Sequence, residues 1–140
     1  MSIITTLVFR FVTPADPDTA WRALTDEPRH FRGLRVESDW LEGSTVRLSA
    51  GAMTIQGEVL HAVPGERLTH TLGDLPGQPE VYVTWELVGA LGGTVVELYV
   101  DEVGPGHFGT GGRDQDVADM EQAWLPVVDA MRAEIARCIR

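Results

Sequence analysis

The stretch DVADMEQAWLPVVDAMRAEIARCI (residues 116–139) decides the fold, because it is the one segment of the chain with a long helical pattern. Roughly 22 helical residues at about 1.5 Å each span roughly 33 Å, enough to cross a sheet of about six or seven strands. Pro126 lies inside the pattern, where a proline removes one hydrogen bond. We therefore expect a kink there, or a separate first turn that ends before it. The apolar residues near one stripe of this helix are Val117, Met120, Trp124, Val127, Val128, Met131, Ile135 and Cys138.

The sequence before this helix alternates apolar and polar residues, as strands do. In the first segment Ile3, Thr5, Leu7, Phe9 and Phe11 share one parity. Glycine or proline residues separate the later segments and predict turns between them. An antiparallel sheet with one apolar face needs a cover, and only the last helix is long enough to provide it. The predicted strands are residues 3–12, 35–40, 46–50, 53–63, 67–72, 80–88 and 94–102.

The segment ADPDTAWRALTDE (residues 15–27) predicts a short helix over about 17–25. Asp16 is suited to the N-cap and Pro17 to the first helical position. Such a helix is shorter than the about 12–15 residues at which isolated helices become marginal in water, so it must dock on the sheet. We expect Ala20, Trp21 and Leu24 to form its docking face. A second short helix is expected over 28–33, and the pair would close the side of a curved sheet.

The composition is that of one globular domain, spanning residues 1–140. The formal net charge of −10 would repel nucleic acid and anionic membrane surfaces alike. No apolar run approaches the about 18 residues of a membrane span, so we expect no membrane insertion. Arg10 interrupts the N-terminal segment where a signal peptide would be apolar, so we expect a cytoplasmic protein. The single cysteine, Cys138, excludes an internal disulfide.

Five segments in the expected order resemble one known superfamily. They are ADPDTAWRALTD, VESDWLEGSTVRL, GEVLHAVPGERLTHTL, VTWELVGALGGTVVELYV and AWLPVVDAM. Together they are similar to the START-like (SRPBCC) helix-grip superfamily, and most of all to its Aha-type branch, named for an activator of the heat-shock chaperone ATPase. The resemblance covers residues 3–138 and implies an α+β fold. In that fold a curved antiparallel sheet wraps around a long C-terminal helix, with two short helices after the first strand. It implies no fixed reaction.

A curved sheet that grips one long helix leaves space near its open end, so the sequence predicts a cavity between them. We expect this cavity to take a small apolar molecule, lipid-like or aromatic, and we expect no cofactor and no metal. A homodimer is left open. Core packing is the ordinary role of the large apolar residues concerned, and lining a pocket is the alternative. The expected cavity residues are Trp40, Met53, Val59, His70, Trp85, Leu98, Trp124, Val128 and Met131.

His70 is the polar residue that we single out, because it shares the parity of Leu68 and Leu72. Facing the cavity, it could orient a ligand carbonyl or act as an acid or base. The alternative is a histidine that bonds to a neighbouring strand or faces solvent. Three functions therefore stay open: a ligand-binding protein, a polyketide cyclase or dehydratase that uses His70, and a chaperone-interacting module. No catalytic residue is assigned.

The glycine-rich residues 104–112 contain GPGHFG, which has the spacing of a dinucleotide-binding loop. That loop must open a helix inside a strand–helix–strand unit, and here only one helix remains, so we do not expect a nucleotide site. The segment is either a lid, with His107 and Phe108 at its tip, or a plain connector. The four histidines lack metal-ligand spacing, and no serine lies in a nucleophile motif.

Overall fold

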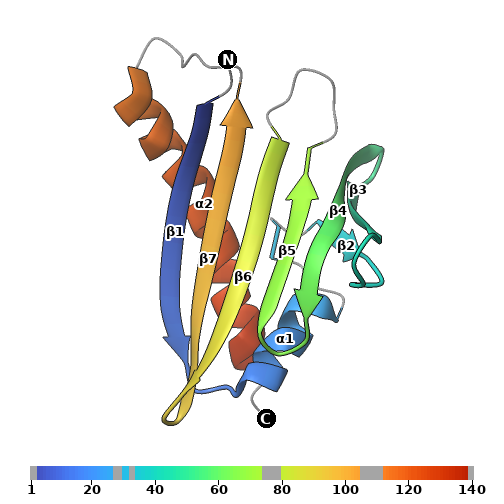
Figure 1. Cartoon of the computed structure of the whole chain (residues 1–140), viewed down its shortest axis with the longest axis vertical. Helices are drawn as coiled ribbons and strands as arrows, with labels where there is room; N and C mark the ends of the chain where they lie inside the picture. The colour runs from blue at the N-terminus through green and yellow to red at the C-terminus, as the bar shows by residue number, and fades with distance from the viewer. Residues whose placement is uncertain (1–2, 27–29, 32–33, 74–79, 105–111, 139–140) are drawn as a thin grey trace.

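The computed structural model describes residues 3–26, 30–31, 34–73, 80–104 and 112–138. All seven strands form one antiparallel sheet in the order β1-β7-β6-β5-β4-β3-β2, with α2 crossing one face of it (Figure 1). The α+β helix-grip prediction is confirmed, with seven strands. The elements are β1 (Ile3–Thr13), α1 (Pro17–Thr25), β2 (Arg35–Glu37), β3 (Thr45–Ala50), β4 (Met53–Val63), β5 (Arg67–Leu72), β6 (Glu80–Ala90), β7 (Gly93–Gly104) and α2 (Gly112–Arg137).

The register of the sheet aligns apolar side chains in rows across its inner face. One row runs through Leu68, Trp85, Leu98 and Phe9 on four neighbouring strands. The next row runs through Val59, His70, Val83, Val100 and Leu7. Side chains one residue apart point to opposite faces, so the alternation of the sequence selects which residues meet the helix. All of these residues except the half-buried Phe9 are buried.

Helix α1 begins as its sequence predicts. The Asp16 carboxylate accepts a hydrogen bond from the Thr19 backbone N–H at 2.8 Å, and Pro17 occupies the first helical position. The docking face differs in one residue from the prediction. Ala20, Ala23 and Leu24 are buried, whereas Trp21 is only half-buried at the margin of the core. The small alanines let α1 approach the sheet closely, and the larger indole packs at its edge.

Helix α2 runs without interruption through Pro126, so the separate first turn that we considered does not occur. Pro126 is exposed, which places the lost hydrogen bond on the solvent side of the helix. Cys138, which we predicted on the apolar stripe, is exposed at the end of the helix. Val117 and Met120 lie outside the residues whose side chains are described. The buried members of the stripe are Trp124, Val127, Val128, Met131 and Ile135.

Two further predictions need correction or stay open. The strand predicted over 35–40 ends at Glu37, and residues 38–44 form a loop instead. The second short helix was predicted over 28–33. Of these residues the structure describes only His30 and Phe31, so this prediction stays open. Within the described part of the chain, no helix combines the length and apolarity that a membrane crossing requires.

Candidate functional site

A cluster of aromatic and histidine side chains occupies the inside of the fold. The rings of His30 and Phe31 lie 4.3 Å apart, and the ring of Trp85 meets that of His30 edge-on at 5.7 Å. The ring centroid of Phe31 lies 6.1 Å from that of His70 and 5.9 Å from that of Trp124. In both pairs the ring planes are nearly perpendicular. These five residues, which we call the inner cluster, bring together the sheet, the long helix and the turn after α1.

Each member of the inner cluster has a distinct structural support. His70 and Trp85 belong to the adjacent strands β5 and β6, on the inner face. Trp124 projects from α2, and the Phe31 backbone carbonyl accepts a hydrogen bond from the Leu34 backbone N–H at 3.0 Å, which shapes the turn that carries His30. Strands and a long helix hold side chains more rigidly than loops do. The cluster is therefore anchored on three sides.

Among the residues that the structure describes, two buried polar atoms of the inner cluster have no hydrogen-bond partner: His30 Nδ1 and Trp85 Nε1. They belong to rings in direct contact. A buried polar atom left unpaired costs about 1–3 kcal/mol, so each one in a native structure calls for an explanation. The indole N–H can only donate, so Trp85 Nε1 requires a hydrogen-bond acceptor. The neutral His30 ring can offer a donor or an acceptor, according to its tautomer.

Burial keeps both histidines uncharged. Loss of hydration, with a smaller contribution from the nearby His70, lowers the pKa of His30 from 6.5 to about 3. Loss of hydration likewise lowers the pKa of His70 to about 4, opposed by its hydrogen bond to the Thr71 carbonyl. His70 Nδ1 lies 3.2 Å from that carbonyl oxygen, so in the neutral ring Nδ1 donates and Nε2 is left as the basic nitrogen. The tautomer follows from this contact.

Most of the predicted cavity residues are buried, some on the inner face of the sheet and the others on α2. Trp40 is half-buried in the loop after β2, and the side chain of Met53 is outside the described set. His70 is a buried polar residue. The buried members of the apolar core are Val59, Trp85, Leu98, Trp124, Val128 and Met131. His30 and Phe31 were not predicted. Their signal was the pairing of a histidine with an aromatic residue directly after a helix that had to dock, but a strand-based parity rule could not place them.

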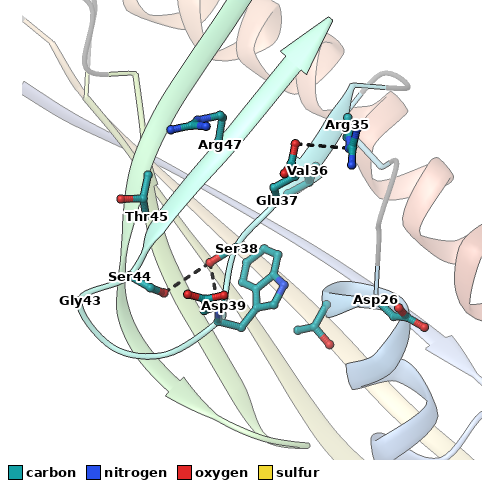
Figure 2. Close-up of a pocket in the computed structure, with 12 residues that line it drawn as sticks. Asp26, Arg35, Val36, Glu37, Ser38, Asp39, Gly43, Ser44, Thr45 and Arg47 are labelled. Atoms are coloured by element: carbon teal, nitrogen blue, oxygen red, sulfur yellow. Dashed lines mark hydrogen bonds and ion pairs between the residues drawn. The ribbon is translucent and has the colours of Figure 1, made fainter.

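A surface groove of about 780 Å³ lies beside the inner cluster, between the end of α1 and the β2–β3 hairpin (Figure 2). Asp26, directly after α1, lines the groove on one side, and Thr45 and Arg47 of β3 line it on the other. An ion pair between Arg35 Nε and Glu37 Oε1, 3.3 Å apart, lies along β2. The rim is thus polar. Among the lining residues, Val36 belongs to the apolar core and Trp40 packs against it.

The glycine-rich segment 104–112 falls almost entirely outside the described residues, so the choice between a lid and a connector stays open. His61 is exposed and lies beside Glu42, with its Nδ1 3.3 Å from the carboxylate oxygen. Within the described residues, no three histidine, cysteine or acidic side chains are grouped so that they could hold a metal ion.

A seven-stranded antiparallel sheet that wraps one C-terminal helix, with an aromatic interior, defines a START-like (SRPBCC) helix-grip protein. The family comparison agrees with this class. The chain belongs to the family described as Activator of Hsp90 ATPase homolog 1-like protein, whose profile matches residues 14–136. No functionally curated protein matches the chain significantly.

Solved structures share the fold. Protein MLL2253 from Mesorhizobium loti superposes with a TM-score of 0.74 at 19% identity, covering 95% of this chain and 98% of that one. CalU16 from Micromonospora echinospora gives a TM-score of 0.70 at 19% identity, covering 97% and 85%. DynU16, from the dynemicin biosynthetic locus, gives a TM-score of 0.73 at 26% identity and covers 94% of this chain. This chain spans 47% of DynU16, about half its length.

Proposed function

We propose that this protein binds a small, mostly apolar molecule between the sheet and α2, and that the ligand carries an aromatic ring and a hydrogen-bond acceptor. The observation that carries the proposal is the pair of unpartnered buried atoms, His30 Nδ1 and Trp85 Nε1, on rings in contact. An interior that served only for packing would be more stable with apolar atoms at both places. A bound carbonyl or hydroxyl group would satisfy them.

The side chains around these two atoms favour a neutral, aromatic ligand. Phe31, His70 and Trp124 present ring faces and edges to the same region, and aromatic pairs favour such perpendicular or offset contacts. The cluster holds no side-chain charge at neutral pH, because burial keeps both imidazoles neutral. A neutral aromatic ketone or phenol therefore fits better than a carboxylate or an amine. The predicted lining residues Trp40, Met53, Val59, Leu98, Val128 and Met131 would complete the apolar wall.

A matched pair of ligands tests this chemistry. The neutral fluorescent ketone 6-propionyl-2-dimethylaminonaphthalene serves as the probe, since its emission rises in apolar surroundings. Its displacement by 2-acetylnaphthalene and by 2-ethylnaphthalene compares an acceptor with a methylene of similar shape. We expect the ketone to compete roughly 2- to 10-fold better, the value of one hydrogen bond. In Trp85→Phe, which lacks the donor, the two competitors should become equivalent. Absence of any probe binding, at concentrations up to its solubility, would refute the proposal.

A second candidate, an enzyme of the cyclase or dehydratase kind, is favoured by the placement of His70. The residue is 1% exposed, and its Nδ1 contact leaves Nε2 free to accept a proton. Aldol-type cyclisation begins with removal of a proton next to a carbonyl, which a neutral imidazole can perform. The same probe reports this step, because its carbonyl has neighbouring C–H protons.

The enzyme candidate predicts faster exchange of those protons for deuterium when the probe is bound in D₂O. Proton NMR would follow the loss of the signal, with buffer alone as background. The expected result is exchange above background in the native protein and none in His70→Phe. Equal exchange in both proteins would remove His70 from catalysis and leave binding as the function.

A further inference from the structure

Trp40 lies where the surface groove meets the inner cluster. It is one of the residues that line the groove, and it packs against the apolar core from the margin. Its ring centroid is 6.2 Å from that of His70, with the two planes 65° apart. Since His70 is only 1% exposed, the indole of Trp40 lies between a buried histidine and the solvent-filled groove. Val36, the other apolar residue of the groove, is fixed in β2 by pairing with β3.

The backbone at Trp40 is held in an unfavourable conformation. Its φ is 55°, and among the described residues it is the only non-glycine residue with a positive φ. Large side chains rarely adopt this left-handed region, because Cβ crowds the backbone there. Such strain persists only where surrounding contacts impose it, and it concentrates at ligand clamps and moving segments. Trp40 is therefore in a conformation that the chain would leave if its supports were released.

Those supports are two serine hydroxyls. Ser38 Oγ accepts a hydrogen bond from the Trp40 backbone N–H at 3.0 Å, and it lies 3.4 Å from Ser44 Oγ (Figure 2). Ser44 Oγ accepts from the Leu41 N–H at 3.1 Å and donates to the Leu41 carbonyl at 2.6 Å. The far end of the loop is tied to β4, where the Gly43 N–H donates to the Val59 carbonyl at 2.8 Å. Water can replace side-chain bonds at a partly exposed loop, so the Trp40 end is the releasable one.

We propose that Trp40 is the gate of the ligand site, and that small molecules reach the inner cluster through the groove when its indole swings away from His70. The inference rests on the proposed binding function and adds the route and its control to it. The polar rim keeps the groove hydrated, while the indole closes the apolar interior from that water. Opening breaks the serine hydrogen bonds, and these determine its free-energy cost. Relaxation of the strained Trp40 backbone offsets part of that cost.

Stopped-flow mixing with 6-propionyl-2-dimethylaminonaphthalene tests the gate, because a gate changes rates more than affinity. In Trp40→Ala we expect the association and dissociation rate constants both to rise about 10-fold or more. The double variant Ser38→Ala/Ser44→Ala keeps the indole and removes its brace, so both rates should rise about 3-fold or more at an unchanged Kd. Trp21→Ala is the matched control, since it removes a half-buried tryptophan that does not line the groove.

The outcomes separate the two proposals. Binding with wild-type rates in both groove variants would overturn the gate and leave the binding function standing. A rise in the dissociation rate alone in Trp40→Ala would make Trp40 a plain wall and would also overturn the gate. If the native protein binds no probe, both proposals fail together. Urea midpoints of all variants, measured alongside, show that each is folded at the temperature of mixing.

Discussion

Acidification from pH 7 to pH 5 should destabilise this protein through its two buried histidines. His30 and His70 have folded-state pKa values of about 3 and about 4, lowered mainly by burial. In the unfolded chain both return to an ordinary value near 6.5. Below pH 6.5 the unfolded state therefore binds more protons than the folded state, and the free energy of unfolding falls as the pH falls. The contribution is complete above pH 6.5 and is lost progressively toward pH 4 and below.

The size of the effect follows from linkage. One shifted histidine contributes up to about 1.4 kcal/mol per pH unit between its two pKa values. Between pH 7 and pH 5, with the onset near 6.5, each histidine costs about 2 kcal/mol, or about 4 kcal/mol for the pair. Carboxyl groups titrate mostly below this interval, so the histidines dominate it. A loss of this size is a large fraction of the usual 5–15 kcal/mol stability of a domain.

Urea denaturation at pH 7 and at pH 5 measures the effect. The quantity to compare is the difference between the two pH values within each protein, because it cancels any loss of packing in a variant. His30→Phe and His70→Phe should each remove about half of the difference, and the double variant should remove most of it. His61→Gln, at an exposed position, should retain most of it. A wild-type loss below about 1 kcal/mol, or a full loss in the double variant, would refute the reasoning.

Substitutions at three positions test the packing and the helix cap. Met131 is fully buried, so Met131→Ala should cost about 2–5 kcal/mol in urea denaturation, and Met131→Leu less than about 1.5; equal costs would contradict a filled core there. Asp16→Ala should lower the melting temperature while Asp16→Asn largely preserves it, since Asn can still accept from the Thr19 N–H. A Cβ at Gly57 would lie 1.7 Å from the Thr71 carbonyl oxygen, so Gly57→Ala should cost about 3 kcal/mol or more, and an unchanged urea midpoint would show that β4 and β5 can separate there.

The fold could be predicted because its signals are local and periodic. Alternating residues assign the strands, and the stripe around Met131 assigns the long helix. The errors fall where a tertiary contact overrides the pattern. Trp40 continues the alternation of Val36 and Ser38, yet the strand ends at Glu37, and the backbone turns to a positive φ at Trp40. No periodicity encodes the serine hydrogen bonds that impose this turn.

The candidate site was predicted only in part for a related reason. Parity placed His70 and Trp85 on the inner face, and both are buried there. His30 lies outside any strand or helix, so its burial depends on how the turn after α1 is seated against β6, which sequence spacing does not determine. The ligand, the chaperone-interacting alternative and the assembly state are likewise matters of three-dimensional contacts, and they stay predictions.

In the described part of the chain, the unpaired buried polar atoms and the strained non-glycine backbone lie around one cluster. His30 Nδ1 and Trp85 Nε1 are unpaired on touching rings, and the strained backbone of Trp40 carries a ring that contacts His70 in the same cluster. Selection for stability alone would remove such costs singly, by an apolar ring at His30 or a glycine at Trp40. Local conflicts that gather in one place are expected at functional sites, where a bound molecule or a required motion compensates for them. An interior that paired its polar atoms internally would have argued for packing alone, so the concentration of unmet bonds and strain around one cluster favours a ligand there.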